Sequence, residues 1–171
     1  MKDEVFVYFD MDGVIAVFEV DDPVEATFEK GYFLHRRPEK TLVSALKKLT
    51  EAGIHVVVCS AAYDNGYAAD EKKQWLKNLG IDNEVIIVPY GMKKSDFVKK
   101  PGVHILIDDY TKNLRQWESK KDQGFVGIKY RNGINGNNGT WDGYSIDRLM
   151  SEKTIYKTIV AIADHELREV K

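Results

Sequence analysis

The stretch VYFDMDGVIAVF, residues 7–18, places two aspartates inside an apolar run near the start of the chain. Asp10 and Asp12 follow a β-branched and aromatic segment, Glu4 to Phe9, which predicts a first strand. A carboxylate that is taken out of water is costly unless an opposite charge or hydrogen bonds compensate it. The pair therefore lies at the surface or beside a cation, and the rest of the sequence bears on this choice.

The composition is typical of a globular protein and is sufficient for a single domain over residues 1–171. Hydrophobic residues make up 43% and charged residues 30% of the chain. The net charge of −2 provides no basic field for a nucleic acid polymer or an anionic membrane. A single cysteine, Cys59, excludes an internal disulfide framework.

The sequence gives no sign of membrane insertion or export. Met1 to Glu4 is polar, and the apolar run that follows is broken by Asp10 and Asp12, unlike a signal peptide. No segment approaches the ~20 uninterrupted apolar residues of a membrane span. We therefore expect a cytoplasmic protein without a membrane partner.

Apolar runs alternate with helical patterns along most of the chain. After the first strand, further strands are predicted at residues 54–60, 84–89, 103–109 and 124–129. Helices are predicted between them at residues 38–53, 68–80 and 111–119. Each strand is a continuous apolar run, which is typical of a parallel sheet covered on both faces. The expected fold class is α/β with a doubly wound parallel sheet.

Two later segments do not follow this alternation. Residues 130–143 form a Gly/Asn-rich stretch, which predicts a chain of tight turns, and we expect Trp141 to anchor it near the site. Residues 151–170 predict a final amphipathic helix with Ile155 and Ile159 on its apolar stripe. That stripe fits either a cover for the sheet or the face of a homodimer.

Polar residues fall where the predicted strands end. In chain order they are Asp10 and Asp12, Ser60, Lys93 and Lys94, and Asp108 and Asp109. Because the carboxyl ends of parallel strands meet at one edge, these side chains are expected to converge. Four neighbouring carboxylates would repel one another, and a divalent cation relieves this repulsion. Mg²⁺ prefers carboxylates, water and phosphate oxygens, so the pattern predicts a Mg²⁺ and phosphate site.

Four short motifs carry a resemblance to a known family. The segments DMDGV, VVVCS, KKSD and LIDDY, in this order, resemble the signature motifs of the haloacid dehalogenase (HAD) superfamily. The resemblance covers residues 4 to about 130 and implies a HAD-like fold with a short cap insertion at about 16–37. Within the superfamily, the segments 31–49, 106–114 and 133–141 are similar to bacterial proteins grouped with cytosolic 5′(3′)-deoxyribonucleotidases.

The resemblance implies a role for each motif residue. Asp10 would be the nucleophile that forms an aspartyl-phosphate, and Asp12 would be the general acid and then the general base. Ser60 would bind the phosphoryl group through its hydroxyl. Lys94, which directly precedes Ser95 in the motif, would neutralise the phosphate charge.

The resemblance also implies how Mg²⁺ would be held. Asp10 and Asp108 would bind the ion, together with the backbone carbonyl of Asp12. Asp109 would lie in contact with the ion or just behind it, and the sequence leaves open which of Asp108 and Asp109 is the direct ligand.

The implied activity is Mg²⁺-dependent hydrolysis of a small phosphomonoester, with a nucleoside monophosphate or deoxynucleotide as the best substrate class. Another small metabolite such as a sugar phosphate is the first alternative. A phospho-acceptor domain without turnover is the second. The insertion is shorter than the helical cap of the animal deoxyribonucleotidases. Its aromatic residues, Phe18, Phe28, Tyr32 and Phe33, fit either base stacking or packing of the insertion itself.

Overall fold

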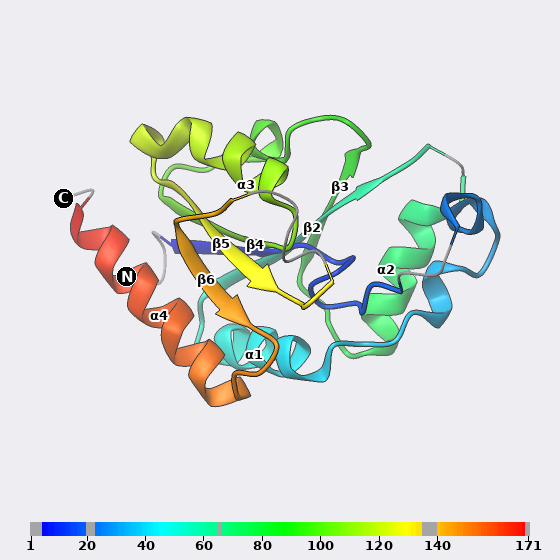
Figure 1. Ribbon diagram of the computed structural model, residues 1–171, viewed down its shortest axis with the longest axis horizontal. Helices are drawn as coiled ribbons and strands as arrows, with labels where there is room; N and C mark the ends of the chain where they lie inside the picture. The colour runs from blue at the N-terminus through cyan, green and yellow to red at the C-terminus, as the bar shows by residue number, and fades with distance from the viewer. Residues whose placement is uncertain (1–4, 20–22, 65, 135–139, 170–171) are drawn as a thin grey trace.

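A six-stranded, all-parallel sheet forms the centre of the protein in the computed structural model (Figure 1). The structure describes residues 5–19, 23–64, 66–134 and 140–169. The strands are β1 (Val5–Phe9), β2 (His55–Ala62), β3 (Glu84–Pro89), β4 (Val103–Asp108), β5 (Phe125–Arg131) and β6 (Tyr144–Asp147). Their order across the sheet is β3-β2-β1-β4-β5-β6, which is the doubly wound arrangement that the sequence predicts.

Helices cover both faces of this sheet (Figure 1). They are α1 (Lys40–Glu51), α2 (Ala68–Asn78), α3 (Thr111–Trp117) and α4 (Glu152–Glu169). Along β1, Val7 packs in the cluster that includes residues of α1, α2 and α4, whereas Tyr8 packs in the cluster that includes Trp117 of α3. Successive side chains of a strand point to opposite faces, so a continuous apolar run fills both cores.

The last two elements complete the fold in a way that the sequence only partly predicted. β6 is a short strand beside β5 that was not predicted, because its four residues, YSID, bury only Ile146 fully. The final helix is α4, and its stripe of Ile155 and Ile159 is buried in the same core as α1. The stripe therefore covers the sheet. Within the described residues, no helix is both long and apolar enough to cross a membrane.

The insertion after β1 is small and carries little regular structure. Its described residues include two short 3-10 helices, η1 (Val24–Phe28) and η2 (Phe33–His35). Glu71 of α2 fastens it to the sheet domain by accepting hydrogen bonds from the backbone N–H groups of Gly31 at 2.5 Å and Phe33 at 3.2 Å. The side chain of Phe33 is buried against Ala62 and Ala68, so the insertion packs on the start of α2.

The strand order reverses at the centre of the sheet, between β1 and β4. The chain runs outward from β1 to β3 and then returns to the other side of β1 as β4. Immediately beyond β1, the N–H of Asp10 donates to the carbonyl of Ile107 at 2.9 Å, so the ends of the two strands lie side by side. In sheets of this kind ligands bind in the crevice beyond such a reversal.

Candidate active site

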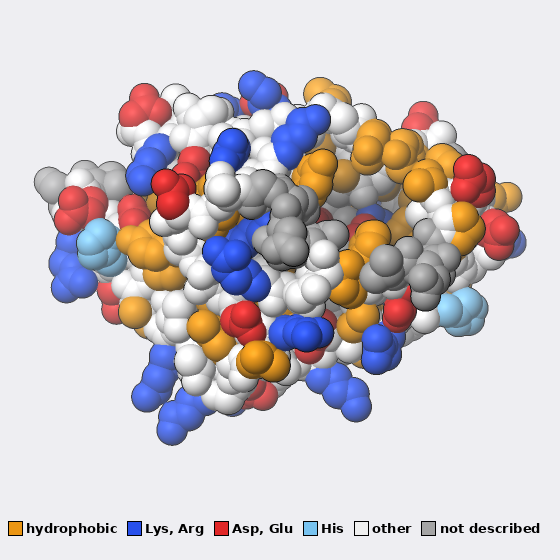
Figure 2. All heavy atoms as spheres, viewed as in Figure 1, with side chains coloured by type: hydrophobic (Ala, Val, Ile, Leu, Met, Phe, Trp, Pro, Cys, Tyr) orange, Lys and Arg blue, Asp and Glu red, His pale blue; other side chains and the backbone are white. Residues whose placement is uncertain are grey.

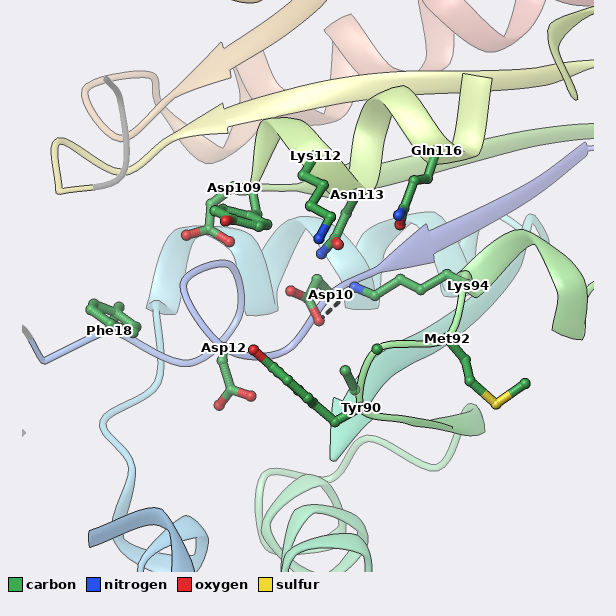
Figure 3. Close-up of a pocket in the computed structure, with 13 residues that line it drawn as sticks. Asp10, Asp12, Phe18, Tyr90, Met92, Lys94, Asp109, Lys112, Asn113 and Gln116 are labelled. Atoms are coloured by element: carbon green, nitrogen blue, oxygen red, sulfur yellow. Dashed lines mark ion pairs between the residues drawn. The ribbon is translucent and has the colours of Figure 1, made fainter. Parts of the chain in front are cut away.

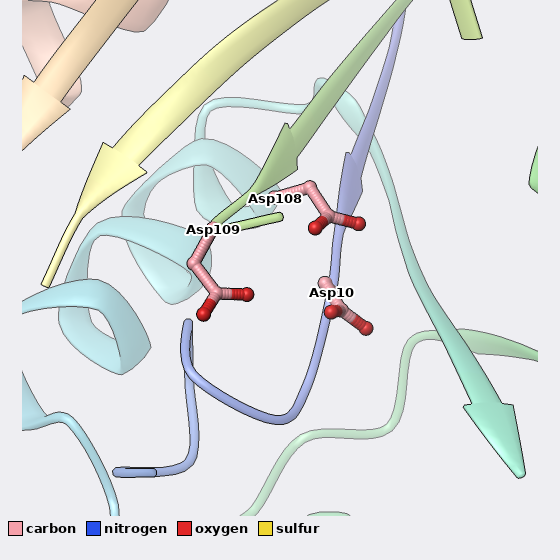
Figure 4. A group of neighbouring side chains, drawn as sticks. All are labelled: Asp10, Asp108 and Asp109. Carbon is pink, nitrogen blue, oxygen red and sulfur yellow. The ribbon is translucent and has the colours of Figure 1, made fainter. Parts of the chain in front are cut away.

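Three carboxylates gather at this reversal point (Figure 4). Asp10 is the first residue after β1, Asp108 is the last residue of β4, and Asp109 follows it. One oxygen from each lies within 4.8 Å of the others, and all three side chains are buried. The parallel sheet thus brings together residues that are about one hundred positions apart in the sequence.

Lys94 is a buried cation that lies between two members of this group, Asp10 and Asp108. It begins the 3-10 helix η3 (Lys94–Phe97), and its Nζ lies 2.9 Å from Asp10 Oδ1, an ion pair drawn in Figure 3. The same Nζ lies 2.7 Å from Asp108 Oδ2. Lys93 is exposed, so the structure separates the two neighbouring lysines. Burial lowers the pKa of Lys94, but the charges of Asp10 and Asp108 outweigh it and the net pKa is raised. Lys94 is therefore held as an ammonium ion.

The charges around Asp10 do not hold its pKa at the ordinary value. Burial raises the pKa of Asp10 to about 7, and the charges of Asp108 and Asp109 act in the same direction against the lowering effect of Lys94. Additional positive charge beside Asp10 would favour its ionised form. The oxygen-only donor set and the raised pKa of Asp10 fit a hard divalent cation such as Mg²⁺. Asp10, Asp108 and Asp109 are the side chains that could hold it.

Neighbouring groups fix the orientation of Asp108 and Asp109. Asp108 accepts hydrogen bonds from the N–H of Tyr110 at 2.8 Å and from the amide of Asn113 at 3.0 Å. The amide of Asn132 donates to Asp109 Oδ2 at 3.0 Å and to the carbonyl of Gly13 at 3.0 Å. Asn113 and Asn132 were not predicted, because they lie outside the carboxylate pairs that end the strands.

Asp12 and Ser60 meet at a different point, on the ammonium of Lys72. The side chain of Asp12 points away from Asp10 (Figure 3), and its Oδ2 lies 2.5 Å from Lys72 Nζ. The same Nζ donates to Ser60 Oγ at 2.9 Å and to the carbonyl of Ala61 at 2.7 Å. Lys72 was missed by sequence reasoning because it lies in the charged run DEKK. The available signal was its position on the buried side of α2, where Ala68, Trp75 and Leu76 also lie.

A pocket of about 440 Å³ opens beside these groups. Asp10, Asp12, Lys94 and Asp109 line its floor, and α3 contributes Lys112, Asn113 and Gln116 (Figure 3). The exposed lining is largely aromatic or apolar, with Phe18, Tyr90, Met92 and Tyr110. Hydrophobic side chains gather around the hollow in the right half of Figure 2. Of the insertion's aromatic residues, Phe18 lines the pocket, whereas Phe33 is buried against α2.

Comparison with known proteins identifies structural relatives only. No family model matches the sequence, and no curated protein does. Among solved structures, the D,D-heptose 1,7-bisphosphate phosphatase of Burkholderia thailandensis aligns over 91% of this chain and 98% of its own, with 15% identity and a TM-score of 0.58. The chain shares the fold of that phosphatase. The comparison and the strand order confirm the predicted α/β fold with a doubly wound parallel sheet.

Two further structures with a similar fold extend the comparison. The D,D-heptose 1,7-bisphosphate phosphatase of B. bronchiseptica, solved with magnesium and phosphate, covers 92% of this chain and 99% of its own, with 15% identity and a TM-score of 0.58. A chain of the Pnkp1/Rnl/Hen1 RNA repair complex covers 74% of this chain and 42% of its own, with 16% identity and a TM-score of 0.56. At these identities the likeness concerns the fold, and any function has to be argued from the side chains.

Proposed function

We propose that this protein is a Mg²⁺-dependent phosphatase that hydrolyses a small phosphomonoester through an aspartyl-phosphate on Asp10. The observation that carries the proposal is the group of buried carboxylates, Asp10, Asp108 and Asp109, with Lys94 between two of them at the sheet reversal. Such a group has no evident structural use, because its burial opposes the ionised state of Asp10. It is suited to hold a cation and a phosphate together.

In the first half of the reaction Asp10 is the nucleophile. A carboxylate oxygen of Asp10 attacks phosphorus while the bond from phosphorus to the leaving oxygen breaks. Asp12, entering in its protonated form, gives its proton to that oxygen, and the alcohol departs. Lys94 neutralises the phosphate oxygens from its position beside Asp10. Mg²⁺ held by Asp10, Asp108, Asp109 and the backbone carbonyl of Asp12 would supply the further positive charge that this transfer needs.

In the second half Asp12 acts as a base. Now a carboxylate, it takes a proton from a water molecule that attacks the phosphorus of the aspartyl-phosphate. The bond from phosphorus to the Asp10 oxygen breaks, and inorganic phosphate leaves. Ser60 and Lys94 hold the phosphate oxygens through both halves of the reaction.

A nucleoside monophosphate is the substrate class that we infer for this pocket. Phe18, Tyr90 and Tyr110 line the same pocket as Asp10 with exposed aromatic surface, which suits a flat base. Asn113 and Gln116 add amide donors and acceptors on the α3 side. A sugar phosphate is the second candidate, favoured by the heptose bisphosphate phosphatases that share the fold.

The test is phosphate release from a panel of ribo- and deoxyribonucleoside monophosphates and sugar phosphates, with Mg²⁺ and with EDTA. We expect Mg²⁺-dependent release that is lost in Asp10→Asn, and nucleotides ahead of sugars. If sugar phosphates were hydrolysed fastest, the inferred substrate class would be wrong, but the proposed phosphatase activity would hold. A folded protein that binds Mg²⁺ and keeps a stable phosphoryl group on Asp10 without release would instead be a phospho-acceptor domain.

A further inference from the structure

Lys72 is a buried lysine that lies outside the four motifs but contacts two motif residues, Asp12 and Ser60. We propose that it is a positioning residue: it holds the Asp12 carboxylate in place as the base that hydrolyses the aspartyl-phosphate. This inference rests on the proposed function and assigns one residue to one half of the reaction.

The ammonium of Lys72 is fully occupied. Its side chain is only 1% exposed, and Nζ lies within hydrogen-bond distance of Asp12 Oδ2, Ser60 Oγ and the carbonyl of Ala61. An ammonium has three protons to donate, so these acceptors match its capacity. A lysine held by three bonds in one position is a fixed support for a carboxylate, unlike a surface lysine that samples many rotamers.

The insertion after β1 also contacts the Lys72 ammonium. The ring of Phe33 lies against the ammonium, with Nζ 4.6 Å from the ring centroid. The adjacent Glu71 holds the backbone of Gly31 and Phe33, so one turn of α2 fixes both the lysine and the ring beside it. A ring face attracts a cation and keeps water from it, which strengthens the ion pair with Asp12.

The geometry assigns Lys72 to the second half of the reaction. An ammonium 2.5 Å from Asp12 Oδ2 attracts the carboxylate form more strongly than the neutral acid, and the carboxylate is the form that accepts a proton from water. In the first half Asp12 is a proton donor, and an adjacent ammonium gives that form no advantage. Loss of Lys72 should therefore slow the step in which water attacks the phosphorus bound to Asp10. The transfer of the phosphoryl group to Asp10 should continue.

The experiment measures steady-state and burst kinetics with 4-nitrophenyl phosphate and Mg²⁺, because its leaving group departs with little help from an acid. Lys72→Met removes the charge, and Lys72→Gln removes it while keeping a polar side chain in case the methionine variant does not fold. We expect kcat to fall by roughly 30-fold or more, with kcat/KM within about threefold of wild type. A burst of about one nitrophenol per protein should precede the slow phase, and acid-quenched samples should contain phosphorylated protein.

The controls separate this role from others. Lys73→Met removes the exposed neighbouring lysine and should leave all constants unchanged. Ser60→Ala tests the other partner of Lys72. If both Lys72 variants behave like Ser60→Ala, with a raised KM and no burst, the lysine acts through phosphate binding and the inference is wrong.

Two further results would also contradict it. A fall in kcat/KM as large as the fall in kcat, in variants with a normal unfolding midpoint, would show a general distortion of the site. A wild-type protein that releases phosphate from no phosphomonoester would overturn the proposed function itself. Normal wild-type turnover without phosphoenzyme in the variants would overturn only the assignment of Lys72.

Discussion

The proposed reaction needs Asp10 in its ionised form, but burial disfavours that form in the folded protein. Its folded-state pKa of about 7 lies above the ordinary value of 3.8, chiefly because it is buried. At pH values between these two pKa values, Asp10 is protonated in the folded protein and ionised in the unfolded chain. The stability of the metal-free protein should therefore fall as pH rises from about 4 to about 7, and stay low above that range.

Asp10→Asn removes the buried carboxyl group and with it the loss of stability at high pH. In EDTA at pH 8 we expect a higher unfolding midpoint than for wild type, on the order of 5 °C, and a smaller difference at pH 5. The variant should lose about a thousandfold or more of any phosphatase activity, because it has no nucleophile. Thermal unfolding followed by circular dichroism at both pH values tests this. A midpoint that falls equally at pH 5 and pH 8 would contradict it.

Lys94 should stabilise the metal-free protein because it lies between two buried carboxylates. Removing one partner of a buried ion pair leaves the other charge uncompensated and costs about 3–5 kcal/mol. We expect Lys94→Met to reduce the free energy of unfolding by roughly that amount in urea titrations with EDTA. The exposed Lys93 provides the matched control, and Lys93→Met should stay within about 0.5 kcal/mol of wild type. Equal effects of the two variants would show that Lys94 does not stabilise the group.

At the scale of elements, the turn after β1 brings Gly13 close to the side chain of Asp109. Gly13 has a φ of +79°, and a Cβ there would lie 2.3 Å from Asp109 Oδ2. The amide of Asn132 donates both to the carbonyl of Gly13 in this turn and to Asp109 Oδ2. The residue type at position 13 therefore controls both a backbone conformation and the position of a candidate metal ligand.

Gly13→Ala should weaken Mg²⁺ binding about tenfold or more, since Asp109 must move aside. Gly66 offers a control with the same backbone strain and no crowding: its φ is +82°, and a Cβ would meet nothing within 4 Å. Gly66→Ala should lose stability and keep its Mg²⁺ affinity. Isothermal titration with Mg²⁺ compares the two, and equal affinities would contradict the steric argument.

At the scale of the whole molecule, the part of the hydrophobic core that α4 covers lies apart from the site. α4 packs its stripe on the sheet beside α1, and none of its residues is among those that line the pocket. The core can therefore be weakened at α4 while the geometry at the sheet reversal stays intact.

Ile159→Ala should lower the free energy of unfolding by about 2–5 kcal/mol, because Ile159 is fully buried. Leu149, which is 86% exposed, is the control, and Leu149→Ala should have little effect. Below its unfolding midpoint the Ile159 variant should bind Mg²⁺ like wild type. Urea titration and calorimetry measure the two properties, and weaker Mg²⁺ binding in the folded variant would show that core and site are coupled.

The sequence by itself determined the alternation of strands and helices and the pairs of carboxylates at the strand ends. These features are local: a continuous apolar run, a helical period or an aspartate after a strand can be read without knowing its partner. The same reasoning missed β6, because a short edge strand buries too few side chains to leave a pattern.

Only the tertiary structure decided which polar residues meet. Lys94 and Lys93 are alike in sequence, and the path of the chain buries one and exposes the other. Lys72 looks like part of a solvated helix face until α2 is placed against Asp12, Ser60 and the insertion. The physical reason is that a charge at such a site depends on partners distant in sequence, whose approach is set by the order of strands across the sheet.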